Sequence, residues 1–175
     1  MSWRLAILPL SAMFVFGSTA SAEIKTLGPG RYSCDTAAGK YAEQEIPALQ
    51  PEKPLTVAIK YISEHADPNW KGDAGISFDT VPERIVVFVG KAQNDPRHIY
   101  VDLWHGNYGD NGILDQYPLS TAWIAITLTV DYDGIVQIGS QGHTARINLH
   151  TPWPVKTLLH CQSGAFEFQV TPPSK

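Results

Sequence analysis

Alternating apolar and polar residues dominate the chain from Leu55 onward. Short segments rich in β-branched and aromatic residues are separated by clusters of Pro, Gly, Asn and Asp. The segments are LTVAIKYI, GISFDTV, RIVVFVGKA, HIYVDLW, WIAITLTV, IVQIGS, ARINLH, TLLHC and AFEFQV. A two-residue period is that of a half-buried strand, and no long helical pattern interrupts the series. The pattern predicts an all-β fold, an antiparallel β-sandwich such as a jelly-roll, or a barrel, with about nine strands.

The segment that precedes Leu55 is less regular. RYSC at 31–34 predicts a short strand, whereas residues 37–45 favour a helical turn or two that Pro47 and Pro51 would end. We therefore expect a short irregular or helical N-terminal segment beside the sandwich.

The N-terminus has the pattern of a secretory signal peptide. Arg4 precedes a 13-residue apolar run, LAILPLSAMFVFG, and an A-x-A end follows at 20–22. The apolar run is shorter than the roughly 20 residues that span a bilayer. We predict a signal peptide at 1–22, a single domain at 23–175 without a membrane span, and export to the periplasm or the cell exterior.

The charge of the mature chain argues against a nucleic-acid partner. Removing Arg4 from the 13 basic residues leaves 12 against 17 acidic ones, a net charge of -5 with neutral histidines. No basic patch is visible in the sequence, and the long-range electrostatic term would be repulsive.

The two cysteines, Cys34 and Cys161, lie near opposite ends of the mature chain. In an oxidising compartment an even pair of cysteines is most simply a disulfide, and neither has the C-x-x-C spacing of a metal or redox site. We therefore predict a Cys34–Cys161 bond.

The stretch WIAITLTVDYDGIVQIGS predicts a hairpin. A three-residue loop at 132–134 pairs Val130 with Val136, which places the apolar sets of both strands on one face and Gly134 at a left-handed position. The acidic DYDG sequence is accordingly interpreted as a turn and not as a metal loop.

The strand HIYVDLW and the glycine-rich loop HGNYGDNG after it carry the candidate binding site. Ile99, Val101 and Leu103 face inward by alternation, which leaves an outward row of Tyr, Asp and Trp. Flat aromatic faces with nearby hydroxyl partners are what sugar recognition requires. The predicted ligand-binding residues are Tyr100, Asp102, Trp104, His105, Asn107 and Tyr108. The competing interpretation is that this face is covered by other protein.

Other chemistry has weaker support in the sequence. Asp110 and Asn111 offer oxygen ligands for Ca²⁺, but their spacing does not match an EF-hand loop. The histidines lack zinc-site spacing. Asp102 with Asp110 or Asp131 could form a glycosidase carboxylate pair, although nothing in the sequence determines their separation. We assign no catalytic residue, and no cofactor other than this weak Ca²⁺ possibility.

Two stretches resemble a known family. FVGKAQNDPRHIYVDL (88–103) and the segment 123–170, from WIAITLTV to AFEFQV, are similar to the core of the farnesoic acid methyltransferase-like domain. The family's middle segment, Y-E-x-x-I-G-G, has no counterpart in GILDQYPLST. The resemblance implies a lectin-like β-sandwich that acts as a ligand-binding module.

These observations favour an exported, non-catalytic protein that binds a carbohydrate or another component of the cell envelope. The alternatives are a glycosidase-type hydrolase with paired carboxylates, and a structural or assembly protein of the envelope. A hydrolase requires two carboxylates in one cleft, whereas an assembly protein would present a flat apolar face or an open sheet edge.

Overall fold

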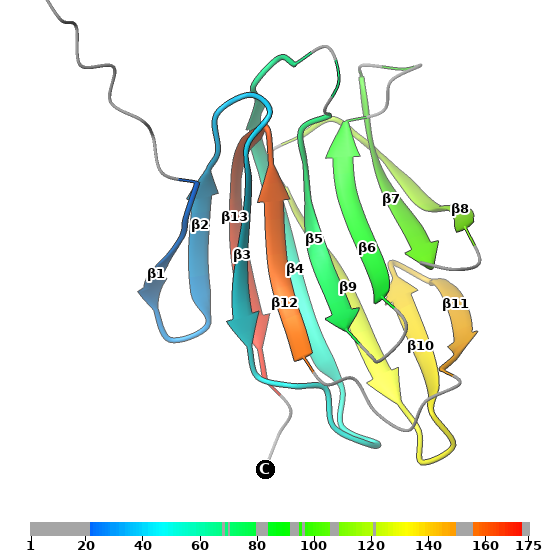
Figure 1. The fold of residues 1–175 in the computed structure, drawn as a ribbon. Helices are drawn as coiled ribbons and strands as arrows, with labels where there is room; N and C mark the ends of the chain where they lie inside the picture. Colours follow the sequence, from blue (N-terminus) through cyan, green and yellow to red (C-terminus); the bar gives the residue numbers. More distant parts are fainter. Residues whose placement is uncertain are drawn as a thin grey trace, which may run out of the picture.

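Two antiparallel sheets form a sandwich in the computed structural model, which describes residues 22–67, 69, 71–79, 84–91, 95, 97–105, 109–120, 122–149 and 156–172. For His105 and for residues 109–113 it describes the backbone only. Within these residues the seven-stranded sheet has the order β1-β2-β13-β4-β9-β10-β11, and the six-stranded sheet has the order β3-β12-β5-β6-β7-β8. Figure 1 shows the six-stranded sheet as the nearer layer. The predicted antiparallel β-sandwich is confirmed.

The strands follow one another along the chain with short connections. The strands are β1 Ile24–Gly28, β2 Arg31–Asp35, β3 Tyr41–Ile46, β4 Leu55–Glu64, β5 Asp73–Asp79, β6 Arg84–Lys91, β7 His98–His105, β8 Gly109–Pro118, β9 Trp123–Val130, β10 Ile135–Ser140, β11 His143–Asn148, β12 Lys156–Gln162 and β13 Gly164–Thr171. Each of the nine predicted segments overlaps one of these strands among its described residues. No helix among the described residues is long and apolar enough to cross a membrane.

The core lies between the sheets and is built by the predicted alternation. Leu55, Val57 and Ile59 on β4 face inward from the seven-stranded sheet, and Ile76 and Phe78 on β5 face them from the other layer. All five are fully buried. Burial of large apolar side chains such as these is the main favourable contribution to folding.

The N-terminal segment differs from the prediction. The helical turn expected at 37–45 is wrong, because Tyr41–Ile46 form β3, which pairs with β12 at the edge of the six-stranded sheet. Strands β1 and β2 extend the other sheet, and only the short strand at 31–34 was anticipated there. The predicted loop HGNYGDNG also proves shorter, because β8 begins at Gly109 and pairs with β7.

The predicted β9–β10 hairpin is confirmed in register. Val130 pairs with Val136, Leu128 pairs with Ile138, and Gly134 has a φ of 80°. The carboxylate of Asp131 accepts hydrogen bonds from the backbone amides of Asp133 and Ile135, at 3.0 and 2.8 Å. Asp131 is therefore part of the turn and lies on a different sheet from Asp102.

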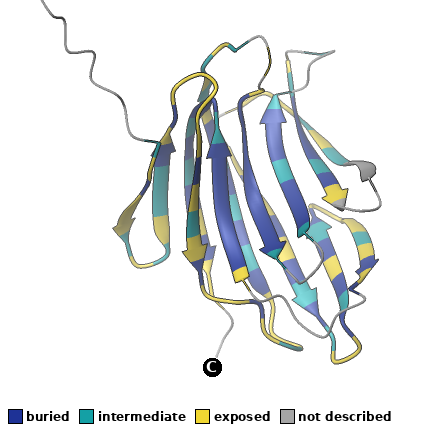
Figure 2. Cartoon of the chain, in the orientation of Figure 1, coloured by how far each residue is buried: buried dark blue, intermediate teal, exposed yellow. Residues whose placement is uncertain are grey.

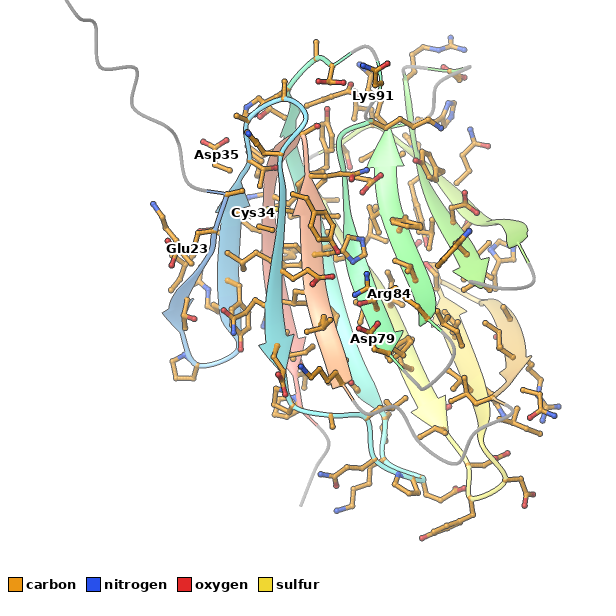
Figure 3. The ribbon with its side chains drawn as sticks, in the orientation of Figure 1. Glu23, Cys34, Asp35, Asp79, Arg84 and Lys91 are labelled. Carbon is orange, nitrogen blue, oxygen red and sulfur yellow. A yellow bond between two sulfur atoms is a disulfide. The ribbon has the colours of Figure 1, made fainter. Side chains whose placement is uncertain are left out.

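The predicted disulfide is present and connects the two layers. Cys34 lies on β2 of the seven-stranded sheet and Cys161 on β12 of the six-stranded sheet, 127 residues apart along the chain. Both cysteines are buried in the core, and Figure 3 labels Cys34 at the β2 side of the sandwich. The bond therefore joins the sheets at the end where β2 and β12 meet.

The outer face of the six-stranded sheet is unusual because its central strand is buried on both sides. Asp73, Gly75 and Ser77 on β5 point away from the core, and yet all three are buried. Figure 2 shows the continuous burial along β5. The described part of the chain contains no third layer over this sheet. Larger side chains on neighbouring strands must therefore cover β5, and they form the site described next.

Candidate functional site

A groove of about 580 Å³ lies on the outer face of the six-stranded sheet. Five adjacent strands supply its lining, because antiparallel pairing brings outward positions of β3, β12, β5, β6 and β7 into rows. The lining residues are Tyr41, Asp73, Arg84, Val86, Phe88, Trp104, His160 and Gln162. The groove thus combines aromatic rings with polar side chains on one surface.

Aromatic rings form the floor of the groove. The ring of His160 stacks on Tyr41 at a centroid distance of 6.1 Å and makes a T-shaped contact with Phe88 at a centroid distance of 5.2 Å. Gly75 lies beside His160 on β5, and a Cβ at Gly75 would come within 2.8 Å of the His160 ring. Trp104, which is 36% exposed, lines the groove from β7. The absence of a side chain at Gly75 therefore leaves space for the His160 ring to pack against the sheet.

Arg84 crosses the same face as the centre of an ion-pair network. Its Nε donates to Oδ1 of Asp79 at 2.7 Å, and its Nη2 donates to Oε1 of Glu43 at 2.7 Å. Strands β5 and β12 lie between β6 and β3, so the Arg84 side chain spans both of them. Figure 3 shows Arg84 beside Asp79 on the nearer face. Hydrogen bonding to Asp79 raises the pKa of Arg84, which keeps the guanidinium charged.

Asp73 and Gln162 form a polar pair at the other end of the groove. Nε2 of Gln162 donates to Oδ2 of Asp73 at 2.8 Å. Asp73 is 6% exposed, and its burial raises the pKa of its carboxyl to about 7 despite that hydrogen bond. Burial disfavours the charged form of a carboxyl group, so the neutral acid is extensively populated at neutral pH.

Several buried polar atoms on this face have no hydrogen-bond partner among the described residues. They are Oδ1 of Asp73, Oγ of Ser77, and Nδ1 and Nε2 of His160. Burial and the nearby Arg84 lower the pKa of His160 to about 3, so its ring is neutral. A buried polar atom without a partner costs roughly 1 to 3 kcal/mol. A ligand that supplies hydrogen bonds in the groove would remove part of this cost.

The predicted outward row has three different environments. Trp104 lines the groove, but Tyr100 is buried at 8% exposure, with Nζ of Lys71 at 5.7 Å from its ring centroid. Asp102 is half-buried, and its Oδ1 accepts a hydrogen bond from the Leu103 amide at 2.8 Å. The inward positions of Ile99, Val101 and Leu103 are confirmed.

The side chains of the other predicted site residues are not described by the structure. Asn107 and Tyr108 lie outside the described residues, as do residues 1–21 of the predicted signal peptide. The side chains of His105, Asp110 and Asn111 are likewise not described. Among the side chains that are described, no group of three or more His, Cys, Asp or Glu residues is arranged to hold a metal ion. The predicted sugar contacts of His105, Asn107 and Tyr108, and the predicted Ca²⁺ contacts of Asp110 and Asn111, stay predictions.

Of the described residues that line the groove, only Trp104 was predicted from the sequence. Tyr41, Asp73 and His160 are far apart in the sequence, and β12 brings them together by pairing with β3 and β5. One sequence pattern could have identified two further lining residues. Applied to RIVVFVGK, the alternation that placed Trp104 outward puts Arg84 and Phe88 opposite the buried Ile85, Val87 and Val89.

Comparisons with known proteins agree on the architecture. No protein-family model and no curated protein match the sequence. The structure is similar to the carbohydrate binding module CBM66 from Bacillus subtilis, with a TM-score of 0.53 and 12% identity over 82% of this chain and 86% of that one. It is also similar to a prokaryotic beta-1,3-1,4-glucanase (lichenase) derived from a mouse hindgut metagenome, with a TM-score of 0.55 and 13% identity over 86% of this chain and 82% of that one.

These likenesses concern the fold. Identities of 12% and 13% carry no residue-level correspondence, and shared architecture does not by itself determine function. The lectin-like sandwich implied by the resemblance to the farnesoic acid methyltransferase-like domain is present. Membership of that family stays a prediction, because no family model matches the sequence. The chain is therefore an antiparallel sandwich of the kind seen in a carbohydrate-binding module and a glucanase.

Proposed function

We propose that this protein binds a carbohydrate in the groove on the outer face of its six-stranded sheet. The observation that carries the proposal is the combination of exposed aromatic rings, Tyr41 and Trp104, with buried polar atoms that have no partner among the described residues. Pyranose rings stack on aromatic faces, and their hydroxyl groups donate and accept hydrogen bonds. A sugar is thus the ligand class that fits both features.

The fold and the disulfide support an exported binding protein. The fold is shared with a carbohydrate-binding module and with a glucanase, and the Cys34–Cys161 bond is of a kind that persists in oxidising compartments. Together with the signal-like N-terminus, these features fit a protein that meets polysaccharides outside the cytoplasm. Periplasmic and extracellular locations are both compatible with them.

Affinity electrophoresis in gels that contain a polysaccharide tests the proposal. The panel should contain β-1,3-1,4-glucan, the substrate named for the similar lichenase, together with neutral mannans, xylans and fructans, and one uronate-rich polymer. We expect slowed migration in a gel that contains at least one neutral polymer. Unchanged migration with every polymer, followed by no binding on a glycan array, would contradict the proposal.

Replacing Trp104 with Ala should weaken polysaccharide binding by about two- to tenfold, because it removes a stacking surface worth roughly 0.5 to 1.5 kcal/mol. Trp104 is 36% exposed, so the melting temperature should fall only slightly. Affinity electrophoresis and thermal unfolding measure the two effects. Trp123→Ala is the matched control, because Trp123 is 38% exposed but lies on β9 of the other sheet. A large loss of stability in Trp104→Ala would instead place Trp104 in a structural role.

A hydrolase is the second candidate, and the raised pKa of Asp73 favours it. A general acid needs a raised pKa, which Asp73 has, and it needs a second carboxylate about 5 to 10 Å away. Of the other described carboxylates on this face, Glu43 and Asp79 are both hydrogen-bonded to Arg84, and Asp102 accepts a hydrogen bond from the Leu103 amide. Release of reducing sugar from the retained polymer, abolished in Asp73→Asn, would establish the hydrolase in place of the binding protein.

The assembly alternative has less support. The exposed large apolar residues among those described are distributed over separate elements of both sheets: Leu27, Tyr41, Ile62, Trp104, Leu119, Trp123 and Tyr132. An assembly protein would be expected to gather such residues at one interface.

A further inference from the structure

The Asp73 carboxyl group has two oxygens in different situations. Oδ2 accepts the hydrogen bond from Nε2 of Gln162 at 2.8 Å. Oδ1 is buried and has no hydrogen-bond partner among the described residues. Asp73 lines the groove, so a ligand there can reach the side chain that holds this oxygen. One oxygen is therefore held by the protein, and the other lies buried at the groove with its hydrogen-bonding capacity unused.

No cation in the described part of the chain forms an ion pair with Asp73. Lys71, the nearest along the chain, lies over the Tyr100 ring, and its charge lowers the pKa of Asp73 by less than burial raises it. Lys91 pairs with Glu64 at 3.6 Å, and Arg84 is shared by Asp79 and Glu43. The titratable and charged groups on the elements around Asp73 are Tyr41, Glu43 and Glu45 on β3, Lys60, Tyr61 and Glu64 on β4, Lys71 before β5, Asp79 on β5, Arg84 and Lys91 on β6, His98, Tyr100, Asp102 and His105 on β7, and Lys156 and His160 on β12. A buried carboxylate supported by one neutral amide donor is poorly stabilised, whereas the neutral acid needs only an acceptor for its proton.

We propose that Asp73 binds the ligand as an uncharged carboxylic acid. Gln162 donates to Oδ2, so the proton resides on Oδ1, and Oδ1–H donates to an oxygen acceptor of the ligand. The chemical class that fits is an uncharged sugar that presents a hydroxyl or ring oxygen at this end of the groove. This inference rests on the proposed function, and it adds the residue that makes sugar recognition dependent on pH.

Asparagine reproduces the proposed state and alanine removes it. In Asp73→Asn the amide oxygen can accept from Gln162 while the NH₂ group donates outward, as Oδ1–H would. If only the neutral acid binds, the wild-type affinity is constant below the pKa of about 7 and is about tenfold weaker at pH 8 than at pH 6. The affinity of Asp73→Asn should match the wild-type value at pH 6 and stay level to pH 8. Asp73→Ala should bind weakly at every pH.

The binding probe is β-1,3-1,4-glucan, or the polymer of the panel above that retains the protein. Affinity is measured by calorimetry at half-unit pH steps. Asp133→Asn is the matched control, because Asp133 is exposed in the β9–β10 turn of the other sheet, and this variant should keep the wild-type pH profile. Affinity that rises with pH, or loss of binding in Asp73→Asn at pH 6, would overturn the proposal, because the carboxylate would then be the acceptor.

A second measurement requires no ligand. The ¹³C chemical shift of the Asp73 carboxyl, assigned with Asp73→Asn, should titrate with a midpoint near pH 7 in the free protein. A midpoint below about pH 5, close to that of an ordinary aspartate, overturns the role of Asp73 even in a protein that binds polysaccharide. Failure of the whole polysaccharide panel instead overturns the proposed function, and with it the ligand contact.

Discussion

Replacing both Cys34 and Cys161 with Ala is expected to lower the free energy of unfolding by about 5 kcal/mol. The bond spans 127 residues of sequence, and a cross-link over so long a loop removes much of the conformational entropy of the unfolded chain. It also joins β2 to β12 across the two layers, close to the chain connections at 36–40 and 163 that pass between the same sheets. Urea denaturation of the oxidised wild type and of the double variant measures the difference.

Reduction provides the control for this prediction. Dithiothreitol should move the denaturation midpoint of the wild type towards that of the double variant, and it should leave the variant itself unchanged. Both side chains are buried, so part of the loss in the variant reflects two smaller side chains in the core. Equal midpoints for the oxidised and reduced wild type would contradict the prediction.

Gly75→Ala is expected to destabilise the protein by about 3 kcal/mol or more. A Cβ at Gly75 would lie 1.9 Å from the carbonyl oxygen of Val87 and 2.8 Å from Cε1 of His160. The first of these atoms is backbone on the paired strand β6, so relief requires separation of β5 from β6. The second lies in the floor of the groove, and we therefore also expect polysaccharide binding to be lost.

Gly139→Ala is the matched control for this substitution. Gly139 also lies within a strand, on β10, but there the nearest atoms to an added Cβ are 3.8 and 3.9 Å away. Its stability should change by less than about 0.5 kcal/mol, since the new methyl group meets only ordinary contacts. Chemical denaturation of both variants measures these changes in the free energy of unfolding. A Gly75→Ala protein as stable as Gly139→Ala would show that β5 and β6 tolerate a side chain at this position.

The strands that the sequence failed to predict have clear physical reasons. Tyr41–Ile46 is rich in residues that favour helices, and only Ala42 and Ile46 are buried there, because β3 is an edge strand. Its state is decided by pairing with β12, more than 100 residues later in the chain. The strand β8 has a turn-like start, GDNG, and is held by the neighbouring β7. Strand pairing overrode local propensity in both cases.

The features that the sequence determined by itself depend on neighbouring residues or on the number of cysteines. Two-residue alternation placed Ile99, Val101 and Leu103 in the core, the hairpin register followed from the apolar faces of its two strands, and two cysteines allowed one intramolecular disulfide. Each depends on residues close together in the chain, or on a choice without an alternative.

The tertiary structure alone decided the site. The sequence indicated an outward Trp104, but Tyr41, Asp73 and His160 join it only through ladders between strands distant in the chain. Whether an outward side chain meets solvent, a neighbour or a ligand also depends on the adjacent strands. Tyr100 is buried on the same face on which Trp104 is exposed. Alternation tells which face a residue takes, whereas long-range pairing determines what that face contains.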